Sequence, residues 1–480
     1  MKASKLITIL KTFSGEDLKR FEKFIISPYH NSGRNLKPLF KAVTKFHPDY
    51  PEDKLSGEKI LKSLRISSGG YNKSSSSQLA VRYSELTRLA KNFLVVENSL
   101  NNSFAYSKTL AEYYNDKNLY NYCRSEIKEC NRILDESGLD ENYALERLLL
   151  QRIISLSYHR ENKKDKALKE ILHIPLYALS YFVTNIKVQL YSNHLEYPVN
   201  YALLKKITDS LNIEELAKLC TDDNSGLKNK MIYDHKRSLF YLYENTELFW
   251  ELIEFYKMNF DQLSDVLKWQ YFLGLMKSGT KLMSTRDFTL FATQLSLLID
   301  FVFQNGVFSF SRKEPLEDVL FNSILRIKIS IESPEKVQEF IEKYLPKVKP
   351  GFRERTKNYA FAFLSFKEGN FTKSLECLNR INSSTLSEKN YLYKLKIAVF
   401  YELKYTEELY YLLDSYNHFI ANNTRFSKQE EHFGFSGIVK TLLSHEGKNN
   451  KLLKNVKNKM MDSIKTSDLG WWVEQKINEF

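Results

Sequence analysis

Two stretches decide the fold class of this chain: residues 358–381, NYAFAFLSFKEGNFTKSLECLNRI, and residues 392–415, LYKLKIAVFYELKYTEELYYLLDS. Apolar residues recur three or four positions apart in both, which predicts amphipathic helices. Turns are expected near Gly369 and Lys404, with Phe371 and Tyr405 buried between neighbouring helices. A shift of 34 residues superposes the two stretches, placing Tyr359 on Tyr393, Phe363 on Ile397, Phe366 on Phe400, Phe371 on Tyr405, Leu375 on Leu409 and Leu378 on Leu412.

This period and pattern resemble the tetratricopeptide family of helical hairpins. Ala362 and Ser374 stand at the small positions where the two helices of a hairpin touch, and Gly369 begins the turn between them. In the second stretch Lys396 and Glu408 occupy the small positions, which predicts a wider or shifted hairpin. The resemblance implies a fold and supplies no ligand. A fainter copy keeps the small, aromatic, small spacing at Ser155, Tyr158 and Ala167.

The composition extends the helical prediction to the whole chain. Its 480 residues include only 16 Gly and 10 Pro, well below the roughly 12% combined share of an average protein. A β-rich chain would need a turn about every 8–12 residues. We therefore expect an all-α fold, a tetratricopeptide-like α-solenoid with an N-terminal helical module. The predicted divisions are a basic helical module at 1–102, the repeat array at 103–438 and basic capping helices at 439–480.

The N-terminal module has its own helical signals. Ser14 is a good N-cap residue, and Asp17 three positions later approximates a capping box. A later helix carries a single apolar stripe formed by Leu79, Tyr83, Leu86, Ala90 and Phe93. Together with that helix, the runs FEKF at 21–24 and SPYHN at 27–31 resemble an uncharacterised bacterial protein family, which implies no activity.

Positive charge is concentrated at the N-terminus. The net charge is +13, and residues 1–100 hold 18 Lys and Arg against 9 Asp and Glu. This excess indicates either a nucleic-acid-binding module or a generic basic surface. Arg82, Arg88 and Lys91 lie off the apolar stripe and are the candidate nucleic-acid contacts. A second basic run near the C-terminus, either a solvated capping face or a binding face, comprises Lys448, Lys451, Lys454, Lys457 and Lys459.

Motifs that carry catalysis or bind metals are missing. No two histidines lie three to five residues apart, so no helix presents a histidine pair to a metal. Walker, Rossmann, GxSxG and HExxH patterns are absent, and the four cysteines form no CxxC pair. We therefore predict no catalytic residues, no cofactor and no metal site. Apolar runs stay below the ~18 residues of a membrane span, and the expected location is the cytoplasm.

A curved helical array offers a long surface for binding other proteins. We accordingly predict a non-enzymatic protein–protein interaction scaffold that binds a protein or peptide partner. The alternative is a nucleic-acid-associated regulatory protein that binds through the basic N-terminal module. Trp471 and Trp472 are expected to hold the last helix against the array.

Overall fold

A computed structural model describes residues 5–64, 73–193, 198–220, 225–311, 314–382, 385–423, 434–445 and 469–479. Most of these residues are helical. Within these ranges there is no β-strand, and the two isolated bridges join Leu139 to Leu263 and Leu316 to Val348. The all-α prediction is thus confirmed. The chain divides into two compact units, residues 1–136 with 153–167, and residues 137–152 with 168–480.

The first unit is built around one long helix, α5. Its helices are α1 (Lys5–Leu10), α2 (Gly15–Ile26), α3 (Lys37–Thr44), α4 (Gly57–Ser63), α5 (Lys73–Asn101), α6 (Ser103–Asp116) and α7 (Tyr120–Ser137). Helices α1, α2 and α4 pack on α5, and α3 lies against α2 and α4. Helices α8 (Tyr143–Arg160) and α9 (Lys164–Ile171) contain residues of both units.

Helix α2 begins as the sequence predicts. Ser14 accepts a hydrogen bond from the Asp17 backbone N–H (3.1 Å), and the Asp17 carboxylate accepts one from the Ser14 backbone N–H (2.9 Å). These two bonds satisfy N–H groups at the helix start, which otherwise lack partners. The hydrogen bonds from Ser14, together with the nearby Arg20, lower the pKa of Asp17 to about 2.

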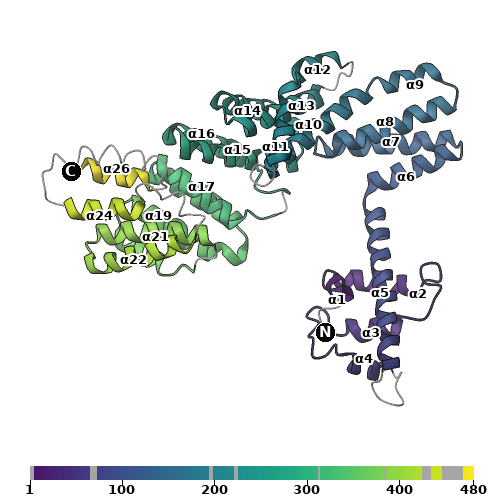
Figure 1. The fold of residues 1–480 in the computed structure, drawn as a ribbon, viewed down its shortest axis with the longest axis horizontal. Helices are drawn as coiled ribbons and strands as arrows, with labels where there is room; N and C mark the ends of the chain where they lie inside the picture. Colours follow the sequence, from purple (N-terminus) through teal and green to yellow (C-terminus); the bar gives the residue numbers. More distant parts are fainter. Residues whose placement is uncertain are drawn as a thin grey trace. The chain divides into compact units, whose positions relative to one another are not determined.

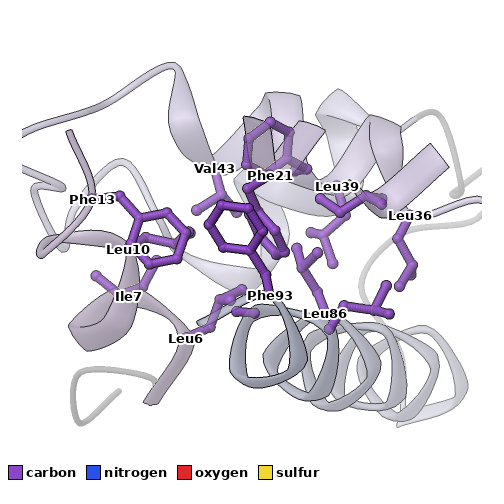
Figure 2. Packing of buried hydrophobic residues seen from close by; sticks show 14 of the residues in the cluster. Leu6, Ile7, Leu10, Phe13, Phe21, Leu36, Leu39, Val43, Leu86 and Phe93 are labelled. Atoms are coloured by element: carbon purple, nitrogen blue, oxygen red, sulfur yellow. The ribbon is translucent and has the colours of Figure 1, made fainter. Parts of the chain in front are cut away.

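The stripe predicted on α5 forms the centre of the first unit's core. Leu79, Leu86, Ala90 and Phe93 are buried, and Tyr83 packs on the same cluster while partly exposed. Figure 2 shows the rings of Phe21 and Phe93 beside one another, with centroids 5.2 Å apart, between the α1 side and the α3 side of this core.

Helices of the second unit pack mainly against their neighbours in sequence (Figure 1). They are α10 (Ile174–Asn193), α11 (Pro198–Ser210), α12 (Ile213–Leu219), α13 (Ser225–Tyr243), α14 (Thr246–Met258), α15 (Asp265–Thr285), α16 (Phe288–Gln304), α17 (Asp318–Ile331), α18 (Pro334–Tyr344), α19 (Arg353–Lys367), α20 (Phe371–Leu378), α21 (Leu386–Glu402), α22 (Thr406–Ala421), α24 (Phe435–His445) and α26 (Gly470–Asn478). Single 3₁₀ turns lie at Phe260–Gln262, Leu345–Lys347 and Pro350–Phe352.

The two stretches that repeat every 34 residues form helix pairs with turns at the expected positions. Gly369 lies between α19 and α20 with φ +77°, and Lys404 lies between α21 and α22 with φ 59°. Both small residues of the first pair are buried, and the Ser374 hydroxyl donates to the Ala362 carbonyl oxygen (2.7 Å). The first hairpin therefore has the close helix contact that its small residues permit.

One part of that prediction is wrong. Phe371 is half-buried, and Tyr405 is 44% exposed rather than buried. Tyr405 is the N-cap residue of α22, at the tip of the hairpin, where its ring contacts Phe400. A ring at a hairpin tip has neighbours on one side and solvent on the other, so the helical spacing alone does not bury it.

Helix α26 is held by its tryptophans. Trp472 is buried, and its indole N–H donates to the Glu402 carboxylate (2.6 Å). Its ring also packs near Tyr401 and Phe366. This arrangement agrees with the expected role of the Trp471–Trp472 pair. The predicted basic run at 448–459 lies outside the described residues.

Candidate functional site

The candidate site is a groove between α16, α17 and α18 in the second unit. Its volume is about 520 Å³, within the range of roughly 300–1,000 Å³ that is usual for binding sites. Apolar and charged side chains both line it. We call this site the α16–α18 groove.

Lys328 lies at the base of the α16–α18 groove with 2% of its surface exposed. Its ammonium donates to the Asp300 carboxylate (2.8 Å), to the Glu332 carboxylate (2.9 Å) and to the Ser296 hydroxyl (3.0 Å). All three donors of the ammonium are used, as a buried charge requires. The Ser296 hydroxyl in turn donates to Glu332. Lys328 therefore fixes two carboxylates beside it at the base of the groove.

Those two carboxylates remain accessible from the groove. The Asp300 side chain is 41% exposed and the Glu332 side chain 16% exposed. Both ion pairs use one oxygen, Oδ1 of Asp300 and Oε1 of Glu332. Among the described residues no hydrogen bond reaches Asp300 Oδ2 or Glu332 Oε2. Each carboxylate therefore offers a second oxygen to a hydrogen-bond donor.

Apolar surface and lysine side chains make up the rest of the groove lining. Leu297 on α16 is 53% exposed, and Phe340 on α18 is buried with its ring 5.2 Å from the Lys328 ammonium. Lys336 and Lys343 on α18 are both exposed. Seven residues separate them, about 10 Å along a helix. The groove thus combines apolar area, acceptors and exposed cations.

A second buried lysine cluster has the same components in a closed form. Lys230 on α13 donates to Asp234 four residues later (2.9 Å) and to the Thr184 hydroxyl of α10 (2.9 Å). Asp234 is completely buried, and it also accepts a hydrogen bond from Tyr271 (2.8 Å) and pairs with Lys187 (3.2 Å). Although burial opposes it, the positive charge of Lys187 and Lys230 lowers the pKa of Asp234.

Arg237 completes this closed cluster. It is 6% exposed, and its guanidinium lies 5.1 Å from the Tyr271 ring centroid and 5.9 Å from that of Tyr233. The cavity beside Tyr233 measures about 10 Å³, room for about one water molecule. No ligand of useful size fits there. We therefore assign this cluster to the core and retain the α16–α18 groove as the candidate site.

The three residues predicted to contact nucleic acid are separated by the structure. Arg88 and Lys91 are exposed one turn apart on α5, whereas Arg82 is half-buried. Lys91 lies beside the exposed Lys5 of α1, whose ammonium lowers the pKa of Lys91. Lys5 and Lys91 are therefore adjacent basic side chains, with the exposed Arg88 one helical turn from Lys91, whereas Arg82 is half-buried.

Other basic side chains of the first unit are partly neutralised. Arg20 pairs with Asp17 and Glu97, and Arg34 pairs with Glu85. Further pairs within the first hundred residues join Lys37 and Lys41 to Glu22, and Lys62 to Glu58. All of these pairs lie at the surface, so they reduce the local positive potential more than they stabilise the fold.

Within the described ranges no three His, Cys, Asp or Glu side chains gather closely enough to hold a metal ion. The four cysteines are free.

By length and composition alone one stretch of the described residues, Lys164–Leu190, is apolar enough to cross a membrane. It contains most of α10, which packs along α13 and carries Lys187 of the closed cluster. The core helix of a globular unit has the same composition.

The sequence prediction did not include the α16–α18 groove. A signal was present, because α17 reads DVLFNSILRIKISI and carries Lys328 within an apolar run, four residues before Glu332. A lysine in an apolar helix with a carboxylate one turn later indicates a buried ion pair. The contributions of Ser296 and Asp300 come from another helix, and the sequence does not pair them with Lys328.

Comparison of the chain with protein-family models, with curated proteins and with solved structures finds no match in any of the three.

Proposed function

We propose that this chain is a non-enzymatic scaffold that binds a protein or peptide segment on a surface of tetratricopeptide-like helical hairpins. The observation that carries the proposal is the α16–α18 groove, in which exposed apolar area lies beside fixed carboxylates and exposed lysines. Binding surfaces commonly combine an apolar centre with charged groups that set orientation. The hairpin contact between Ala362 and Ser374 supports the repeat part of the proposal.

The proposal includes a cytoplasmic location. Its support is the four free cysteines, two of them buried, because thiols in a reducing compartment stay unpaired.

A peptide-display selection on the immobilised full-length chain tests the binding proposal. Leu297→Glu places a charge inside the groove, whereas Leu290→Glu places one on the same helix, two turns away and outside the groove lining. The two leucines are similarly exposed, at 53% and 46%, so the substitutions have similar effects on stability. We expect the wild type and Leu290→Glu to enrich common peptides that Leu297→Glu does not retain. Equal enrichment by both variants would place binding elsewhere.

A second candidate function, nucleic-acid association through the N-terminal module, is favoured by one observation. Lys5, Arg88 and Lys91 bring like charges together at the surface, and a bound phosphate would relieve their repulsion. The ion pairs on α2, α3 and α4 weigh against a broad basic face. We therefore rank this candidate below the scaffold.

A further inference from the structure

We infer that the α16–α18 groove selects peptide segments carrying an arginine or lysine side chain, which inserts against Asp300 and Glu332. This inference rests on the proposed function and names the chemistry of the partner. Its basis is the contrast between the open cluster around Lys328 and the closed cluster around Lys230.

The two clusters share one design. In each, a buried lysine on one helix pairs with a carboxylate four residues later and with a hydroxyl group from a neighbouring helix. The hydroxyl groups are those of Thr184 and Ser296. The Lys328 ammonium donates to three acceptors and the Lys230 ammonium to two, and both lysines are buried, so neither is available to bind an anion.

The clusters differ in what their carboxylates still offer. Asp234 accepts from Lys230 and Thr184 on Oδ2, and from Tyr271 on Oδ1, where Lys187 also lies at 3.2 Å. In the α16–α18 groove, Asp300 and Glu332 each have one oxygen bonded to Lys328 and a second oxygen open. Among the described residues, no second ammonium pairs with Asp300 or Glu332 in the way that Lys187 pairs with Asp234. A cationic side chain from a partner would supply it.

Charge at the groove base also favours a cation. Lys328 and its two carboxylates together carry one net negative charge. Burial lowers the pKa of Lys367, and the nearby Glu332 carboxylate opposes that shift. Lys367 does not line the groove, its ammonium donates to the Ile329 carbonyl oxygen, and among the described residues it forms no ion pair with Asp300 or Glu332. An anionic ligand at the base would face both carboxylates, and it would leave their open oxygens without a donor.

The apolar lining suits the stem of the same side chain. Arginine and lysine bury their methylene groups along apolar surface while the charged head reaches a polar partner. Leu297 and Phe340 supply such surface beside the carboxylates. The exposed Lys336 and Lys343 on α18 would then face backbone carbonyl oxygens or acidic residues of the same peptide.

The test uses the peptides enriched in the display selection, synthesised with a fluorescein label and titrated against the full-length chain by fluorescence anisotropy. We expect the enriched peptides to share an arginine or lysine. Replacing that residue by norleucine should weaken binding roughly tenfold or more, because a charge-assisted hydrogen bond is lost. Asp300→Asn should weaken the original peptide similarly and leave the norleucine peptide unchanged.

Glu339→Gln is the matched control, because Glu339 is an exposed groove carboxylate that does not contact Lys328. It should change affinity less than about threefold. Tryptophan fluorescence of each variant checks that the second unit is folded. Enriched peptides without a common basic residue, or equal effects of Asp300→Asn and Glu339→Gln, would overturn the inference while leaving the scaffold proposal intact. A selection that enriches no peptide dependent on Leu297 would overturn both.

Discussion

Replacing Asp234 by Asn should destabilise the second unit more than any surface charge change. The Asp234 carboxylate is completely buried and receives hydrogen bonds from Thr184, Lys230 and Tyr271 at 2.8–2.9 Å. Asparagine keeps the shape but removes the charge that balances Lys187 and Lys230. The nearest other carboxylate, Glu141, lies 3.4 Å from Lys187 and is 38% exposed. Breaking a buried ion pair from one side costs about 3–5 kcal/mol, and we expect a loss in that range.

Urea denaturation followed by tryptophan fluorescence measures this loss. The chain's four tryptophans all lie in the second unit, so their signal reports on that unit alone. If the slope of the unfolding free energy against urea concentration is unchanged, the substitution alters stability and not compactness. Asp209→Asn is the control, since Asp209 is an exposed carboxylate that also accepts a tyrosine hydroxyl, that of Tyr243 at 2.6 Å. Its expected cost is below about 0.5 kcal/mol.

The pH dependence gives an independent check. Burial lowers the pKa of Lys187 below its usual 10.5, and the charge of Asp234 opposes that shift. A base with a lowered folded-state pKa binds more protons when unfolded, so stability rises with pH between the folded and unfolded pKa values. Without the Asp234 charge, the folded-state pKa of Lys187 falls further, so the pH range over which stability rises is wider. The variant should therefore regain more stability than the wild type as the pH rises toward the unfolded-state pKa of Lys187, 10.5.

The carboxylate's own titration lies at the acidic end. Because the folded-state pKa of Asp234 is lowered, its stabilising contribution is present above the unfolded value of about 3.8 and is lost as the pH falls through the folded value. The wild type should therefore lose stability on acidification more steeply than the variant. A loss below about 1 kcal/mol near pH 7, with parallel pH profiles, would refute the assignment of Asp234 as the balancing charge.

Three further predictions concern packing and charge. Phe366→Ala removes a ring that is 2% exposed and contacts the C-terminal tryptophans, and it should cost about 3–5 kcal/mol in the same urea assay. Gly274→Ala should cost about 1–3 kcal/mol, because the added Cβ would overlap the buried Arg237 guanidinium. Replacing Arg88 and Lys91 together by Ala should reduce the slope of log affinity for an oligonucleotide against log salt concentration by about two units. Titration of the full-length chain at two salt concentrations measures this slope. An unchanged slope would retire the nucleic-acid candidate.

Local signals in the sequence located helices and turns well. The Ser14 capping box, the apolar stripe on α5 and the turns at Gly369 and Lys404 all depend on residues within about one or two helical turns. Such short-range patterns fix local backbone structure. Exposure was less predictable, as Tyr405 shows, because it depends on which other helix passes over a given face.

The candidate site was not predictable for a related reason. Its chemistry requires Ser296 and Asp300 from α16 to meet Lys328 of α17 and Glu332 at the C-cap of α17. The sequence shows the Lys328–Glu332 spacing, but it does not show which neighbouring helix supplies the other partners. Conversely, composition pointed to residues 1–100, where ion pairs with carboxylates engage Arg20, Arg34, Lys37, Lys41 and Lys62.

One buried-lysine arrangement occurs in two settings, one closed and one open. Both lysines cost free energy to bury, and both are retained by pairing with a carboxylate four residues later. Around Asp234 every acceptor is satisfied internally, and the adjacent cavity has room for about one water molecule. Around Asp300 two acceptors remain open beside about 520 Å³ of space. The proposed binding function rests on this openness.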